Sequence, residues 1–128
     1  MLDHVGFSVA DLATSRAFYE KPLKPLGVTL MMEVTEEMTG GHGSHLGFGK
    51  DEPKFWIGTG PRHREPIHVA FAAANRAEVD AFYRAAMAAG GIDNGPPGLR
   101  PHYHEDYYGA IVRDPDGHNI EAVCHRAE

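Results

Sequence analysis

Three short runs of β-prone residues each contain a side chain that can bind a divalent metal. These side chains are His4, His68 and Glu121. Side chains alternate between the two faces of a strand, and the apolar neighbours of each of the three occupy the opposite face. The face that carries the histidines otherwise holds small residues such as Ser8 and Ala70, which leave room for a pocket. We therefore predict that the three side chains line one pocket.

Two imidazoles and one carboxylate suit Fe(II), Mn(II), Ni(II) or Zn(II), and three protein ligands leave coordination positions open for a substrate. These ligands reduce the charge of a divalent ion only to about +1, so the ion stays a Lewis acid. Cys124 is the single cysteine, which excludes an intrachain disulfide and a cysteine-based zinc site. One histidine alone would be better explained as structural, so the hypothesis depends on how the histidines are related.

The histidines belong to an internal repeat that covers much of the chain. Residues 3–27 align with residues 67–91 without a gap, at an offset of 64 positions that pairs His4 with His68. The identical positions include two adjacent aromatic residues, which chance does not readily produce, so we interpret the chain as a duplication. The first module then covers about 1–62 and the second about 63–128.

Each module is predicted to fold as β-α-β-β-β. The opening strands are expected at 2–9 and 66–73, and each is followed by a helix start, at Asp11 and at Asn75. The later strands are predicted at five short β-prone runs: 28–34, 46–48, 55–57, 107–112 and 120–123. Prolines should end the first helix early and leave little regular strand after Gly91.

The stretches DHVGF, HVAF and DPDGHNIEAV, together with the duplicated pattern, resemble the vicinal oxygen chelate superfamily over essentially the whole chain. This group includes glyoxalase I, extradiol dioxygenases, methylmalonyl-CoA epimerase, fosfomycin-resistance thiol transferases and bleomycin-binding proteins. The resemblance implies one α+β domain over residues 1–128, with curved mixed sheets around a pocket and helices outside. It also implies a homodimer in which His4 of one subunit meets the partner's His68 and the partner's Glu121.

Four strand positions face the metal in that superfamily, and they correspond to His4, Trp56, His68 and Glu121 of this chain. An indole cannot bind a metal ion, so the resemblance implies a His-His-Glu site, as in the dioxygenases and fosfomycin transferases, rather than that of glyoxalase I. Trp56 is then expected to form a wall of the pocket. Further pocket residues are predicted at positions that share these faces: Ser8, Ala70 and Asn119.

The segment 100–108 is unusually dense in titratable and hydrogen-bonding groups and could fold over the mouth of the pocket. His102 or His104 could act as a general base near neutral pH or as a further ligand. Tyr107 or Tyr108 could donate a hydrogen bond to a substrate oxygen. A polar surface loop without a catalytic role is the alternative interpretation.

The composition is that of an ordinary folded protein, with 42% hydrophobic and 23% charged residues. The net charge of −6 carries no basic block, which argues against a nucleic-acid surface. No stretch approaches the roughly 20 apolar residues that span a bilayer, so we expect a cytoplasmic protein.

Two functions remain open at this stage. The first is a metal-dependent lyase, isomerase, dioxygenase or thiol transferase that acts on a small oxygen-bearing molecule. The second is a metal-free protein that binds a small molecule or antibiotic, as bleomycin-resistance proteins do.

Overall fold

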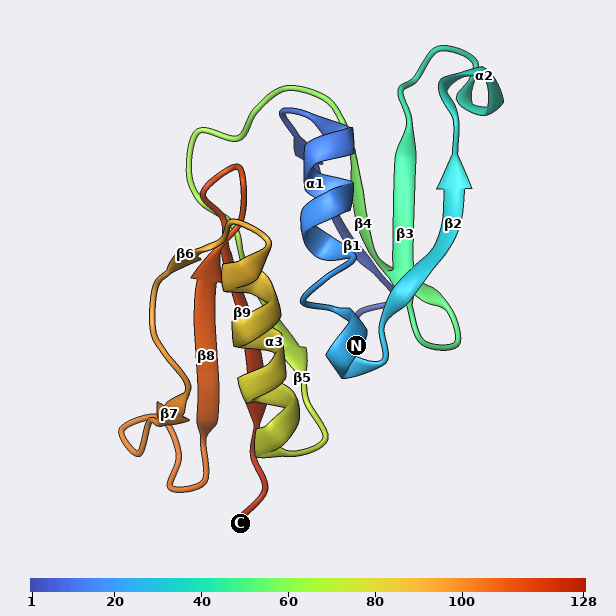
Figure 1. Ribbon diagram of the computed structural model, residues 1–128. Coiled ribbons are helices and arrows are strands. Elements are labelled where there is room, and N and C mark those ends of the chain that lie inside the picture. The colour runs from blue at the N-terminus through green and yellow to red at the C-terminus, as the bar shows by residue number, and fades with distance from the viewer.

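The computed structural model describes all 128 residues and contains two modules of similar design (Figure 1). Module one comprises β1 (Val5–Val9), α1 (Leu12–Tyr19), the 3-10 helix η1 (Lys24–Leu26), β2 (Thr29–Val34), α2 (Glu36–Thr39), β3 (His45–Gly49) and β4 (Pro53–Thr59). Module two comprises β5 (His68–Ala72), α3 (Arg76–Ala88), β6 (Ile92–Asp93), β7 (Gly98–Leu99), β8 (Tyr108–Arg113) and β9 (Asn119–Cys124). The predicted α+β duplication is confirmed.

Each module builds its own sheet. The strand order is β1-β4-β3-β2 in module one and β5-β9-β8-β6 in module two, where β7 also pairs with β8. In both sheets the first strand of the module runs parallel to the last one. The register places Gly6 beside Trp56 and Ala70 beside Glu121, so Trp56 occupies the position in module one that Glu121 occupies in module two.

The helices begin at the predicted residues. The side chain of Asp11 accepts a hydrogen bond from the Thr14 backbone N–H at 2.9 Å, and that of Asn75 accepts one from Glu78 at 2.9 Å. Helix α1 has 8 residues and ends before Pro22, whereas α3 has 13. None of the helices combines the length and apolar character needed to cross a bilayer.

Two local features depart from a regular β-α-β-β-β pattern, and the first of them was predicted from the prolines after Gly91. The strand expected after the helix of module two is split into β6 and β7, each of 2 residues. Pro96 and Pro97 lie between them and cannot donate to a ladder. The short helix α2 has 4 residues and was not expected. Its first turn is capped by the Thr35 hydroxyl, which accepts from the Met38 backbone N–H at 3.4 Å.

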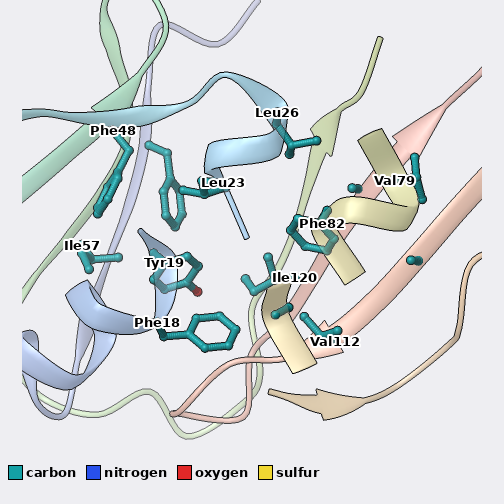
Figure 2. Packing of buried hydrophobic residues seen from close by; sticks show 14 of the residues in the cluster. Phe18, Tyr19, Leu23, Leu26, Phe48, Ile57, Val79, Phe82, Val112 and Ile120 are labelled. Atoms are coloured by element: carbon teal, nitrogen blue, oxygen red, sulfur yellow. The ribbon is translucent and has the colours of Figure 1, made fainter. Parts of the chain in front are cut away.

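Buried apolar side chains of both modules form one core cluster. Figure 2 shows Tyr19 of α1 and Phe82 of α3 in this core, between residues such as Phe48 of the first sheet and Val112 of the second. Both sheets therefore pack their helix-covered faces into a common core. Their opposite faces stay open, and His68 on β5 is exposed there.

The turn that joins β8 to β9 makes hydrogen bonds to module one and so links the two modules. The backbone N–H of Gly117 donates to the Asp114 carbonyl at 2.9 Å, which closes the turn. The buried Tyr19 hydroxyl donates to the Asp114 carboxylate at 2.5 Å, and the backbone N–H of Ala10 donates to Asp116 at 3.1 Å. Burial and the negative charge of Asp114 raise the pKa of Tyr19 well above its usual range, so the phenol stays neutral and donates.

Candidate metal centre

Glu121 and His68 lie together on the open face of the second sheet. Their strands are adjacent and parallel, and His68 Nε2 lies 3.1 Å from Glu121 Oε1. The glutamate side chain is 4% exposed and the histidine side chain 53% exposed, so the imidazole lies on the solvent side of the carboxylate.

No lysine or arginine pairs with the Glu121 carboxylate. The only basic group within ion-pair distance is His68. Burial of a carboxylate is costly unless a cation or hydrogen-bond donors compensate its charge. A carboxylate oxygen and an imidazole nitrogen that converge from neighbouring strands are donors that a divalent ion accepts, so this pair fits part of a metal site.

Tyr107 engages the second oxygen of the same carboxylate. Its hydroxyl donates a hydrogen bond to Glu121 Oε2, while Oε1 is the oxygen that faces His68. Burial, followed by the hydrogen bond and the charge of Glu121, raises the pKa of Tyr107 to about 12. Tyr107 is therefore a neutral donor at physiological pH.

These groups border a cavity of about 500 Å³ on the open face of module two. Its lining residues are His68, Asn94, Tyr103, Tyr107, Ile111, Asn119 and Glu121. Asn94 and Asn119 are joined by a side-chain hydrogen bond of 2.5 Å. Asn119 was predicted from the sequence as a pocket residue, whereas Asn94, Tyr103 and Ile111 were not. The proline-interrupted stretch around Asn94 gave no alternating pattern from which to assign its face.

The equivalent face of module one has a separate cavity of about 230 Å³, which is bordered by Ser8, Trp56 and His45 among others. Trp56 packs closely over two glycines of the neighbouring strands, because a Cβ at Gly47 would lie 2.8 Å from the indole ring and one at Gly6 would lie 3.0 Å from Trp56 Cβ. The indole N–H donates to the Pro53 carbonyl at 3.1 Å. Trp56 thus borders this cavity with its indole N–H already engaged by the backbone.

Ser8 borders the same cavity, but its hydroxyl is already engaged. It donates to the Pro61 carbonyl at 2.5 Å, and the backbone N–H of Ser8 donates to His63 Nε2 at 3.3 Å. Both contacts attach the linker between the modules to β1.

His4 lies apart from the other two predicted ligands within the single chain. Its Nδ1 is 2.7 Å from the carboxylate of Asp3, and its side chain is 60% exposed. No three histidine, cysteine, aspartate or glutamate side chains of the chain gather closely enough to hold a metal ion. One subunit thus contains the His68–Glu121 pair in one place and His4 in another.

Only one of the four candidates from segment 100–108 reaches the cavity, and it is Tyr107. The Tyr108 hydroxyl instead donates to Asp80 of α3 at 2.7 Å, on the helix-covered side of the sheet. The ring of His102 packs on Tyr103 with centroids 4.1 Å apart, and His104 Nδ1 accepts from the Asp106 backbone N–H at 3.2 Å. Neither histidine borders the cavity.

A family model for the glyoxalase/bleomycin resistance protein/dioxygenase superfamily matches residues 1–122. The chain belongs to this superfamily. The resemblance predicted from the DPDGHNIEAV stretch and the duplicated module is thereby confirmed, because the match spans both modules. Members of the superfamily share this fold and differ in chemistry, so the activity must be argued from the site.

Solved structures of the same fold include several members of the superfamily. A glyoxalase/bleomycin resistance protein from Albidiferax ferrireducens is 31% identical, with a TM-score of 0.74 and 99% of each chain covered. A mutant of the fosfomycin resistance protein FosX from Listeria monocytogenes, solved with Mn(II) and 1S,2S-dihydroxypropylphosphonic acid, is 20% identical, with a TM-score of 0.67 over 96% of this chain and 88% of that one. A glyoxalase I mutant from Zea mays is 22% identical, with a TM-score of 0.68 over 95% of this chain and 46% of that one. The last two similarities show the fold alone, and no curated protein matches the chain.

Proposed function

We propose that the protein is a divalent-metal-dependent enzyme that acts on a small oxygen-bearing molecule, with His68, Glu121 and His4 as the ligands. The observation that carries this proposal is the buried Glu121 carboxylate, which has no lysine or arginine partner and lies 3.1 Å from the half-exposed His68. A divalent ion would neutralise the buried charge and reach the site from the solvent side.

The separation of His4 from the other two ligands favours a homodimer. Both sheets direct their helix-covered faces into one core, so each open face has its own cavity within a subunit. A second copy that brings its module one against module two would supply His4 to His68 and Glu121. The same arrangement would set Trp56 of that copy opposite the metal, as a wall without a fourth ligand.

The bound ion would supply Lewis acidity, polarising oxygens of the substrate. The chain's own groups would bind and orient the substrate around it. The amides of Asn94 and Asn119 offer donors and acceptors at the cavity wall, and the indole of Trp56 offers a flat apolar surface. Lyase, isomerase, dioxygenase and thiol transferase reactions are all compatible with such a site.

The test is metal binding by untagged protein, reconstituted separately with Mn(II), Fe(II), Ni(II) and Zn(II) and measured by elemental analysis after desalting. We expect one ion per subunit in the wild type and loss of the ion in His4→Ala, His68→Ala and Glu121→Gln. His42→Ala is the matched control, because this histidine is exposed and borders neither cavity. A wild type that retains none of the ions, or an equal loss in the control, would refute the proposal.

The second candidate is a metal-free binding protein, and the feature that favours it is the cavity that Trp56 borders on the open face of module one. A cavity with an aromatic wall can hold a planar ligand without any metal. Ligand-induced quenching of the single tryptophan should then survive both a chelator and Glu121→Gln. Binding that disappears with the chelator contradicts this candidate and favours the enzyme.

A further inference from the structure

We propose that Tyr107 is a positioning residue for Glu121: its hydroxyl holds Oε2, so that Oε1 alone faces His68 and binds the metal as a single-oxygen ligand. This inference rests on the proposed function, because it concerns the geometry of the same metal site. It assigns to this tyrosine a role toward the protein ligand, in place of the predicted role toward a substrate oxygen.

The first support is the division of the carboxylate between two partners. Tyr107 donates to Oε2, and His68 Nε2 lies 3.1 Å from Oε1. A carboxylate with both oxygens free can bind a metal with both of them and fill two coordination positions. When one oxygen is engaged by a hydrogen bond, the other binds alone, and one more position stays open for the substrate. Partners of this kind orient metal ligands in many proteins.

The second support is the way in which the phenol ring is held. The Tyr107 ring packs edge-on against the rings of Tyr103 and His125, with a centroid distance of 5.1 Å to each. Its backbone N–H donates to the His104 carbonyl at 3.0 Å, and its carbonyl accepts from Arg100 at 2.7 Å. The hydroxyl is thus fixed by contacts that do not involve Glu121, as a positioning group requires.

The third support is the space that Gly109 leaves for this pair. A Cβ at this position would lie 2.9 Å from Glu121 Oε2 and 3.1 Å from Tyr107 Cε1. Gly109 is buried in the interior of β8 and does not have a positive φ. Glycine weakens a strand interior, so its presence here is explained by the close approach of the carboxylate and the phenol rather than by backbone conformation.

The test compares Tyr107→Phe with the wild type in Co(II) titrations of the full-length protein, with Tyr108→Phe as the matched control. The control removes the hydroxyl of the adjacent tyrosine, which donates to Asp80 away from the cavity. Removal of such an orienting partner typically weakens metal binding about 10- to 100-fold, and we expect a rise of this size in the Kd of Tyr107→Phe only. The visible absorption of Co(II) should also fall in this variant, because a second carboxylate oxygen raises the coordination number.

Gly109→Ala provides a second variant in which the Tyr107 hydroxyl is kept but the carboxylate is displaced. It should also weaken Co(II) binding, and thermal unfolding followed by circular dichroism verifies that each variant is folded. Wild-type affinity and spectrum in Tyr107→Phe would overturn this inference and leave the proposed function standing. A wild type that binds no Co(II), Mn(II), Fe(II), Ni(II) or Zn(II) would refute both.

Discussion

Tyr19→Phe should destabilise the protein by about 1.5 to 3 kcal/mol, the usual contribution of a hydrogen bond to a charged group. Tyr19 is fully buried, and its hydroxyl donates to Asp114 Oδ2 at 2.5 Å across the junction of the modules. The backbone N–H groups of Asp116 and His118 both donate to the other oxygen, Oδ1. The substitution therefore leaves Oδ2 buried without its donor, while the ring and its packing are retained.

Urea unfolding at neutral pH, followed by the fluorescence of Trp56, measures the loss. All variants must be compared at one protein concentration, because association of subunits adds to the apparent stability. The matched control is Tyr83→Phe at the repeat-equivalent position, where an exposed hydroxyl donates to Asp93 at 3.0 Å. Surface changes of this kind stay within about 0.5 kcal/mol.

Equal losses in the two variants would contradict the reasoning, since they would show that burial of the Asp114 carboxylate adds nothing to the hydrogen bond. A loss in Tyr19→Phe below about 0.5 kcal/mol would contradict it as well.

Two further predictions concern alkaline pH and the glycine that packs under the Trp56 ring. The pKa values of Tyr19 and Tyr107 are raised in the folded protein, the latter to about 12, above the value of about 10 in an unfolded chain. The stabilisation that these two tyrosines contribute is therefore complete below about pH 10 and is lost as the pH rises toward the folded pKa values. The urea midpoint of the wild type should fall over this pH range. An equally steep fall of the midpoint in Tyr107→Phe would show that Tyr107 does not contribute to it. Gly47→Ala places a Cβ 2.8 Å from the Trp56 ring. This overpacking should lower the free energy of unfolding by about 1 to 3 kcal/mol and shift the tryptophan emission. Unchanged emission and stability would show that the indole does not lie across Gly47.

The strand faces could be predicted because alternation along a strand is a local property. Ile120, Ala122 and Cys124 are buried in the core, and Glu121 between them lies on the open face, as the apolar pattern predicted. The same rule required Tyr107 and Tyr108 to point to opposite sides. The alternation rule does not show which of the two faces the cavity, because both residues are tyrosines and the start of β8 has no apolar pattern.

Contacts between distant segments could not be predicted. The sequence Asp-Pro-Asp-Gly at 114–117 is typical of a tight turn, and the structure has a turn there. Nothing local indicated that its first carboxylate accepts a hydrogen bond from Tyr19, 95 positions earlier in the chain. Such a pair depends on how the two modules pack, and side-chain polarity along one segment carries no information about that packing.

The junction built by Tyr19 and Asp114 makes the two halves of the duplication similar in fold but not interchangeable. A chain made of two copies of module one would have residues 49–54 in place of residues 113–119, because Phe55 corresponds to Ile120, and this shorter segment lacks the Asp-Pro-Asp-Gly turn. A chain made of two copies of module two would carry Val79 where Ser15 approaches Asp116 at 3.5 Å. Each half therefore supplies only part of the contacts that join the two, and the halves are not equivalent at this junction.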